Sequence, residues 1–211
     1  MKKLIIIGAR GFGREIVDFS KFCIGYNVDF EIKGFLDDKH DALDTFEDYP
    51  SIISSVEKYE IQKDDVFISG LGSVVWTEKY VKLILEKGGV FINLIHKNAV
   101  LRKNVSLGKG IIIGTGTLVS TDVKIDDFTQ IMAYCVIGHD VKIGKFCRLG
   151  DFVFIGGFSK INDSTFLAVR STILANVNVG SFVTVGASSL VIKNVKDNIS
   201  VFGIPAKKIE F

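Results

Sequence analysis

The feature that most constrains the fold of this chain is a six-residue periodicity in its second half. From Leu101 to Val191, every sixth residue is Leu, Ile or Val, which gives sixteen aliphatic positions in one frame. Two residues before each of them stands a small or β-branched residue, as expected for side chains packed inside a narrow prism lined by strands. Fixed repeats of this kind are typical of solenoids, in which each unit stacks on its neighbours.

The residue after each aliphatic position indicates where the chain turns. Eight of these sixteen sites carry glycine, and Asp126 and Asn162 occupy two more. Such residues tolerate bends and positive φ angles, so we expect each hexad to be a short strand followed by a corner at these residues. Three hexads would form one triangular coil of 18 residues, and the array would hold about five coils joined by parallel strand pairing.

The residues before the repeat follow the pattern of an α/β domain. KKLIIIG, at 2–8, is a continuous apolar run typical of a buried parallel strand, and it precedes a glycine-rich turn. We predict helices at 14–22 and 74–88, and further strands at 31–38, 64–72 and 89–95. The chain is therefore predicted to contain an α/β domain at 1–95 and a β-helix with a C-terminal tail at 96–211.

Composition excludes several classes of protein. The 211 residues include 26 basic and 24 acidic side chains with no basic run longer than a Lys pair, which argues against binding to nucleic acid or an anionic membrane. The apolar start is too short for a signal peptide, and no segment approaches the length of a membrane span. Three cysteines without CxxC spacing favour neither disulfides nor a zinc site, and Cys135 and Cys147 occupy the small inner position of the repeat. We expect a cytoplasmic protein with small-molecule partners and no metal.

The turn GARGFG follows the first predicted strand and precedes a helix, where backbone N–H groups and the helix dipole can hold a phosphate. Its glycines are Gly8, Gly11 and Gly13. Because Arg10 occupies the place of the second glycine in the dinucleotide fingerprint, a nicotinamide-dependent dehydrogenase is disfavoured. The alternative is that the glycines only permit a tight turn.

Two acids, Asp37 and Asp38, close the second predicted strand of the α/β domain. In such folds an acid at this sheet edge commonly meets ribose or base hydroxyls of a nucleotide. An Asp pair at the end of a strand is also common in solvated turns, so both interpretations stay open.

One of the three histidines stands at a corner of the repeat. His139 lies two residues after Ile137 and directly before Asp140. Histidine side chains ordinarily titrate close to neutral pH, so a His supported by a carboxylate can act as a general base; a structural role is equally compatible with the spacing. His40 is expected at the surface, and His96 is expected to be structural.

Five segments together resemble the sialic-acid O-acetyltransferase family of bacterial sugar O- and N-acetyltransferases, hexapeptide-repeat enzymes that act on nucleotide-linked amino sugars. They are IIIGARGFGREI, GFLDD, INLIHKNAVL, VIGHDVKIG and VIKNVKDNISVFGIPAKKI, and they extend over nearly the whole chain. The resemblance implies a Rossmann-like N-terminal domain, a left-handed parallel β-helix, a homotrimer, and active sites between neighbouring β-helices.

The same resemblance implies a role for particular residues. His139 would be the general base, with Asp140 in support, for transfer of an acetyl group from the co-substrate acetyl-CoA to an amine or hydroxyl of a nucleotide-activated sugar; no bound cofactor is implied. The nucleotide sugar would contact Gly8, Ala9, Arg10, Gly11, Gly13, Asp37 and Asp38. The acyl-CoA would contact Arg148, Gly157, Ala175 and Ala187, with the closing GIPAK near its groove.

Two departures from the family pattern concern the acyl site. Met132 stands where relatives usually have Asn, and Arg148 where they commonly have a second His; a third is Gly138, where an acid often precedes the catalytic His. An Arg cannot share a proton as a His can, but it can clamp a phosphate or carboxylate. Besides the active enzyme, a non-catalytic trimeric nucleotide-sugar-binding protein is therefore a second hypothesis.

Overall fold

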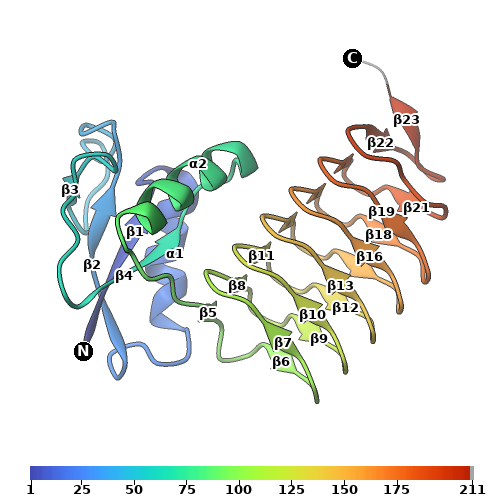
Figure 1. Ribbon diagram of the computed structural model, residues 1–211, viewed down its shortest axis with the longest axis horizontal. Coiled ribbons are helices and arrows are strands. Elements are labelled where there is room, and N and C mark those ends of the chain that lie inside the picture. Colours follow the sequence, from blue (N-terminus) through green and yellow to red (C-terminus); the bar gives the residue numbers. More distant parts are fainter. Residues whose placement is uncertain (210–211) are drawn as a thin grey trace. The chain divides into compact units, whose positions relative to one another are not determined.

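The computed structural model describes residues 1–209, which form two compact units (Figure 1). The first unit is Met1–Leu94, and the second begins at Ile95. Residues 210 and 211, the end of the predicted second domain, lie outside the described residues. The elements of the first unit are β1 (Lys2–Ile7), α1 (Gly11–Lys21), β2 (Phe30–Leu36), β3 (Ile52–Ser54), β4 (Asp65–Ser69) and α2 (Val74–Glu86).

The first unit is built on a parallel four-stranded sheet with the order β3-β2-β1-β4. β1 is central, and its Leu4, Ile5, Ile6 and Ile7 are buried, which explains the continuous apolar run in the sequence. The chain builds β2 and β3 on one side of β1 and returns to place β4 on the other. This reversal of direction creates a crevice at the carboxyl ends of β1 and β4, the usual ligand position in open α/β sheets.

Two details of the first unit differ from the expectation. β3 is a short edge strand in a segment for which no element was predicted, since three residues are too few to show a periodicity. The strand expected at 89–95 is reduced to β5 (Leu94–Ile95) and an isolated bridge between Phe67 and Phe91. The five other predicted elements, at 2–8, 14–22, 31–38, 64–72 and 74–88, are confirmed, with boundaries shifted by a few residues.

The second unit is a parallel β-helix whose two-residue strands form three sheets. The β12 sheet contains β6 (Val100–Leu101), β9 (Leu118–Val119), β12 (Val136–Ile137), β15 (Phe154–Ile155), β18 (Thr172–Ile173) and β21 (Leu190–Val191). The β13 sheet contains β7 (Ser106–Leu107), β10 (Lys124–Ile125), β13 (Lys142–Ile143), β16 (Lys160–Ile161) and β19 (Asn178–Val179). The β14 sheet contains β5, β8 (Ile112–Ile113), β11 (Gln130–Ile131), β14 (Arg148–Leu149), β17 (Phe166–Leu167), β20 (Thr184–Val185), β22 (Ser200–Phe202) and the antiparallel β23 (Lys207–Ile209).

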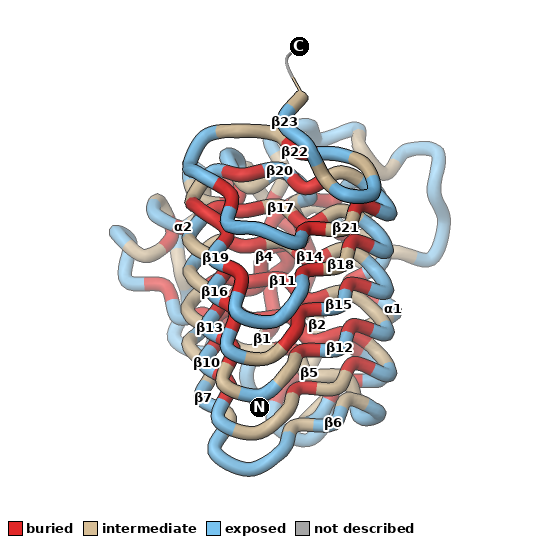
Figure 2. The backbone as a smooth tube through the Cα atoms, turned by 90° about the vertical axis from the view of Figure 1, so that its right-hand side faces the viewer, coloured by how far each residue is buried: buried red, intermediate tan, exposed pale blue. Residues whose placement is uncertain are grey.

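The register confirms the 18-residue coil. Lys124 pairs with Lys142, and Lys142 pairs with Lys160, so each strand lies beside the strand one coil later. The repeated aliphatic residues point inward and are buried from Ile113 to Val191, as the red segments of the coils in Figure 2 show. The five strands of the β13 sheet agree with the expected number of coils.

The small inner residues also carry a ladder of hydrogen bonds. The hydroxyl of Thr117 donates to Met132 O at 2.8 Å and accepts from the N–H of Cys135 at 3.1 Å. Cys135 continues the ladder, because its Sγ lies 3.1 Å from Gly150 O. Cys135 and Cys147 are buried, and burial raises the pKa of each thiol to about 12. The interpretation of both as small core residues is confirmed.

The role expected for the corner glycines was wrong. The left-handed conformation falls two residues after them, at the third position following each aliphatic residue from Leu101 to Val185, and large side chains such as Phe128 (φ 61°) and Tyr134 (φ 56°) adopt it. The glycines instead permit close stacking of corners. A Cβ atom on Gly114 would lie 2.5 Å from the carbonyl carbon of Met132 in the next coil.

The left-handed conformation strains residues other than glycine. At these aromatic residues, ring stacking between coils offsets the strain. The rings of Phe128 and Phe146 are stacked with centroids 5.1 Å apart, and those of Tyr134 and Phe152 are stacked at 5.3 Å. Such ring pairs contribute about 0.5–1.5 kcal/mol beyond the burial of their area.

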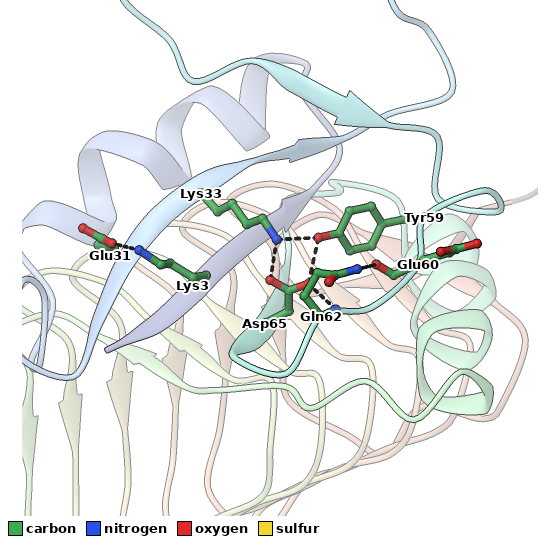
Figure 3. Close-up of polar contacts among 7 residues, drawn as sticks. All are labelled: Lys3, Glu31, Lys33, Tyr59, Glu60, Gln62 and Asp65. Carbon is green, nitrogen blue, oxygen red and sulfur yellow. Dashed lines mark hydrogen bonds and ion pairs between the residues drawn. The ribbon is translucent and has the colours of Figure 1, made fainter.

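A polar network around the buried Asp65 joins β2 to the start of β4 (Figure 3). The Nζ of Lys33 donates to Asp65 Oδ1 and to the Tyr59 hydroxyl, both at 2.7 Å, while that hydroxyl and the Gln62 N–H donate to Asp65 Oδ2. Burial alone would raise the pKa of Asp65, but the hydrogen bonds from Lys33, Gln62 and Tyr59 lower it overall. The folded first unit therefore holds this carboxylate in its charged form.

We expect Asp65→Asn to destabilise the first unit by about 2 kcal/mol at pH 7, because the ammonium of Lys33 loses its charged partner. A lowered carboxyl pKa contributes stability above the unfolded value, about 3.9, and this contribution is lost as pH falls through the folded value. The difference between the variant and the wild type should accordingly shrink at pH 3. Urea unfolding followed by the fluorescence of Trp76, the only tryptophan, measures it; an equal effect of Asp64→Asn, its exposed neighbour, would contradict the prediction.

Candidate functional sites

The first unit contains a pocket of about 640 Å³ at the carboxyl ends of its strands. It is lined by Ile7, Gly8, Arg10, Phe12, Leu36, Asp37, Asp38, Lys39, Val56, Gly70, Leu71, Gly72, Ser73, Trp76 and Tyr80. These residues come from the ends of β1, β2 and β4 and from the start of each helix. The pocket thus occupies the crevice that the strand order creates.

The three glycines of the GARGFG turn differ in what they do. Gly8 has φ +96°, and a Cβ on Gly13 would lie 1.8 Å from Gly8 O, so the turn and the close approach of α1 require these two. Gly11 has open space where its Cβ would be, and the fold gives no reason for a glycine there. Its missing side chain keeps the start of α1 accessible.

The amino end of α1 lies at the pocket, to which it contributes Arg10 and Phe12. Within residues 1–209 no side chain caps this helix; its N-cap residue is Arg10, in an extended conformation. Uncapped N–H groups together with the helix dipole favour a bound anion. Arg10 and Lys39 in the pocket lining add positive charge.

Asp37 and Asp38 line the pocket and accept hydrogen bonds there, Asp37 half-buried and Asp38 exposed. Asp37 accepts hydrogen bonds from the N–H of Ala9 at 2.8 Å and of Lys39 at 2.9 Å. Asp38 accepts from the Val56 N–H at 3.3 Å and from the hydroxyl of Tyr80. Five of the seven predicted nucleotide-binding residues therefore line this pocket or bond directly to its lining, and Gly11 and Gly13 continue the same turn.

Sequence reasoning missed the aromatic wall of this pocket. Trp76 and Tyr80, one turn apart on α2, stack with ring centroids 5.8 Å apart. Burial, and then the bonded Asp38, raises the pKa of Tyr80 to about 12, so this hydroxyl stays protonated and donates to Asp38. The i, i+4 spacing of two aromatics after a strand was a visible signal, but it is equally common in helices that pack against a core.

The β-helix places His139 at the corner between β12 and β13. Its Nδ1 lies 2.8 Å from Asp140 Oδ2, and the His139 side chain is 55% exposed. Because a carboxylate can only accept, Nδ1–H donates to Asp140, and in the neutral ring Nε2 is then the acceptor. Asp140 has φ 59°, a conformation that Asp tolerates well, and this brings its carboxylate to the neighbouring ring.

The next coil forms a seat for the His139 ring. A Cβ on Gly157 would lie 2.8 Å from both Cε1 and Nε2, so the ring rests over the bare Cα of that residue. The ring of Phe158 meets the imidazole edge to face with centroids 4.9 Å apart. Asp140, Gly157 and Phe158 together fix the imidazole in one orientation.

The four residues predicted to bind acyl-CoA lie at three different places in the β-helix. Ala175 follows Gly157 at the same corner, one coil further on, because their strands β15 and β18 pair with an offset of 18 residues. Ala187 lies at the corner between β20 and β21. Arg148 lies on the β14 sheet, where its Nη1 donates to Gln130 Oε1 at 2.5 Å, and not at the His139 corner.

Within residues 1–209, the other two histidines form no further candidate site. The Nδ1 of His96 accepts the Asn98 N–H at 3.0 Å, and burial lowers the pKa of this imidazole. His40 is exposed in the segment after β2. Across residues 1–209 no group of three or more His, Cys, Asp or Glu side chains is arranged to hold a metal ion, and no helix there is long and apolar enough to cross a membrane.

Comparisons with known proteins agree with this architecture. Residues 3–83 match the PglD N-terminal domain, and residues 122–157 match the bacterial transferase hexapeptide (six repeats). PerB from Caulobacter crescentus, solved with CoA and GDP-perosamine, is 23% identical over 100% of this chain and 98% of its own, with a TM-score of 0.87. The acetyltransferase domain of PglB from Neisseria gonorrhoeae, solved with acetyl coenzyme A, is 21% identical over 99% of both chains, with a TM-score of 0.89.

A third solved structure, WeeI from Acinetobacter baumannii, is 22% identical over 99% of this chain and 100% of its own, with a TM-score of 0.74. At these identities the likeness establishes the fold. The predicted fold class, a Rossmann-like α/β N-terminal domain followed by a left-handed parallel β-helix, is confirmed. The left-handed turn is an exception to the usual crossover rule and could not be derived from the periodicity.

The contrast between Gly11 and Gly13 gives a matched pair of variants. Gly13→Ala should destabilise the first unit by about 3 kcal/mol, because the new methyl group collides with the backbone of Gly8. Gly11→Leu should change stability by less than about 0.5 kcal/mol yet weaken binding of GDP or UDP at least tenfold, because the side chain covers the amino end of α1. Thermal unfolding and titration calorimetry measure the two effects. Nucleotide binding by Gly11→Leu at the wild-type level would refute a phosphate site at this turn.

Proposed function

We propose that this protein is an acetyl-CoA-dependent transferase that moves an acetyl group to an amine of a nucleotide-activated sugar. The observation that carries the proposal is the His139–Asp140 pair, seated on Gly157 with its Nε2 free to take a proton. The solved structures of similar fold include PerB with CoA and GDP-perosamine and a PglB domain with acetyl coenzyme A. Their ligands, CoA or acetyl coenzyme A and GDP-perosamine, are of the kinds proposed here for the His139 corner and for the pocket of the first unit.

In the proposed reaction the acceptor amine attacks the thioester carbonyl carbon of acetyl-CoA directly. The C–N bond forms while Nε2 of His139 removes a proton from the amine, and the carboxylate of Asp140 stabilises the resulting imidazolium. The C–S bond then breaks, and the CoA sulfur takes the proton from His139. General base catalysis of this kind contributes about 10²–10⁴-fold, and the rest of the acceleration comes from holding two large substrates together.

The pocket of the first unit is proposed to hold the nucleotide of the acceptor. Its diphosphate would lie at the amino end of α1 near Gly11 and Arg10, where donors and positive charge meet. Asp37 and Asp38 would receive hydroxyl or ring N–H donors of the nucleoside. Trp76 offers an aromatic face of the size that a base can stack on.

Transfer to a hydroxyl, as in the sialic-acid O-acetyltransferases, is the second form of the same proposal. The amine is preferred because one solved structure of similar fold is that of a perosamine N-acetyltransferase from Caulobacter crescentus. A non-catalytic nucleotide-sugar-binding protein is the alternative class, motivated by Met132 and by Arg148, which is held by Gln130. Two expectations stay predictions: that Arg148 and Ala187 bind acyl-CoA, and that the protein is cytoplasmic.

One assay separates these hypotheses. The protein is mixed with acetyl-CoA and a panel of nucleotide-linked amino sugars and hydroxyl analogues, and the release of free thiol is followed. Turnover with an amine acceptor supports the N-acetyltransferase, and turnover only with hydroxyl acceptors supports the O-acetyl form. Nucleotide-sugar binding without any thiol release would favour the binding protein.

The functional assembly is proposed to be a homotrimer. On the outer face of the β12 sheet, Val136 and Phe154 are 37% and 42% exposed, and Leu174 beside this sheet is also exposed. A run of exposed apolar side chains along one face favours burial against another copy of the chain. Light scattering at micromolar concentration should give three times the 23.2 kDa of the chain; a monomer would contradict the prediction.

The role of His139 can be separated from mere packing by two variants. His139→Ala should lower kcat by roughly 10²-fold or more with little change in KM, because the general base is lost. Gly157→Ala keeps the imidazole but forces it off its seat, so kcat should fall by roughly tenfold or more while the fold is retained.

Steady-state kinetics and circular dichroism of both variants provide the measurements. Lys145→Ala, at an exposed position of the corner between β13 and β14, is the control and should keep near-wild-type kcat. If kcat of His139→Ala stays within a few-fold of the wild type, His139 is structural and the proposed mechanism is wrong.

A further inference from the structure

Phe158 is an exposed aromatic residue at the corner that holds His139, in a position where the fold does not need one. It is 60% exposed, and its φ of 60° is the left-handed conformation, which strains residues other than glycine. The other left-handed positions of the same corner carry Asn or Asp, which tolerate this conformation: Asn104, Asp122, Asp140 and Asn176. Among these five positions, only Phe158 carries a large apolar side chain.

Neither backbone bonding nor packing between coils accounts for this ring. The Phe158 N–H donates to His139 O at 3.0 Å. One coil further on, the Asn176 N–H makes the equivalent bond at the same distance, so the bond does not depend on a phenyl side chain. The two aromatic pairs described above gain stacking between coils. Within residues 1–209, by contrast, Phe158 stacks on no aromatic side chain, and the one ring that it meets is the His139 imidazole.

The phenyl ring lies against the proposed general base and is largely exposed to solvent. Its centroid is 4.9 Å from that of the imidazole, with the two planes at 86°. The adjacent Gly157 has no side chain, and Ala175 follows it one coil further on; the acyl-CoA arm is predicted to lie along this column. Phe158 belongs to the neighbouring column, in which Asn176 comes next. The ring therefore offers an apolar surface beside the imidazole and outside the column predicted for the donor.

A sugar ring is a ligand of the right chemistry for such a surface. The hydroxyls of a hexose lie around its rim, whereas its faces carry mainly C–H groups. When a face covers an aromatic ring, apolar surface leaves water while the rim hydroxyls keep their hydrogen bonds. The negative face of the π-system also attracts the weakly positive C–H groups. In the proposed reaction, the part of the acceptor that must lie beside His139 is the sugar that carries the amine.

We propose that the phenyl ring of Phe158 packs against the C–H face of the acceptor sugar and directs its amine toward Nε2 of His139. This inference rests on the proposed function and adds to it a specificity-determining residue, because acceptors without a hexose face gain nothing from this ring. It also accounts for the strain, since a left-handed phenylalanine is kept for substrate binding at a cost in stability.

The variant Phe158→Asn removes the ring and introduces a residue type that the same corner already carries at Asn176. The matched control is Phe182→Asn, because Phe182 is also 60% exposed, with φ 55°, at the corner between β19 and β20. Phe158→Tyr keeps an aromatic face. We expect thermal unfolding of Phe158→Asn at the wild-type temperature or above it, because Asn tolerates the left-handed conformation better.

Binding is measured by titration calorimetry with UDP-, dTDP- and GDP-linked amino hexoses and with the free nucleoside diphosphates. We expect the wild type and the control to bind at least one linked sugar more tightly than its free nucleotide. Phe158→Asn should bind that sugar about three- to tenfold more weakly, with unchanged affinity for the free nucleotide, and Phe158→Tyr should bind it as the wild type does. In steady-state kinetics the acceptor KM of Phe158→Asn should rise by the same factor, while the donor KM should not change.

Three outcomes overturn the proposal. No linked sugar binds the wild type more tightly than its nucleotide; or Phe182→Asn loses as much sugar affinity as Phe158→Asn; or Phe158→Asn keeps the wild-type sugar affinity, even if its kcat or its stability falls. Thiol release by the wild type is assayed in parallel. Weaker sugar binding by Phe158→Asn without any turnover by the wild type would refute the proposed function alone. Turnover by the wild type with unchanged acceptor affinity in Phe158→Asn would refute this inference alone.

Discussion

The parallel pairing of each strand with the strand 18 residues later is the constraint on which the β-helix and its candidate site depend. Each coil must repeat the shape of the one below it, so equivalent residues of successive coils stack in columns. The inner columns hold the buried aliphatic residues and the ladder in which Thr117 and Cys135 take part. The outer columns are free to vary in residue type. One of them holds His139, Gly157 and Ala175 in successive coils around the same corner, and the His139 ring lies over Gly157, where a side chain would collide with it.

Close stacking also determines which residues the corners accept. The first corner residue must often be glycine because a Cβ would touch the backbone of the next coil, as at Gly114 and Gly156. Two residues later the chain adopts the left-handed conformation, and an N–H there bonds to the coil below, as Tyr134 does to Thr115 O at 2.8 Å. This bond and ring stacking explain why aromatic residues occupy positions that glycine would adopt with less strain.

The first unit obeys a different constraint, the reversal of strand order around β1. The carboxyl ends of β1, β2 and β4 meet there, and the turn at Gly8, the acids at Asp37 and Asp38 and the start of α2 converge on one pocket. The network of Lys33, Tyr59 and Asp65 joins β2 to the start of β4 without taking part in the pocket. The opposite end of this sheet is therefore stabilised separately from the proposed nucleotide site.

The sequence by itself determined the β-helix, the division into two architectures, the buried character of Cys135 and Cys147, and the position of His139 at a corner. These features follow from local patterns, namely a strict period of six residues and continuous apolar runs. Such patterns can be recognised without knowing which distant residues are in contact. The handedness, the α/β strand order, the seat of His139 on Gly157 and the aromatic wall of Trp76 and Tyr80 were decided only by the tertiary structure. Each of them depends on which residues far apart in the chain come together, and periodicity carries no information about that: Gly8, Gly11 and Gly13 look alike in the sequence, yet only the packing of α1 against the turn shows that Gly11 is not required by the fold.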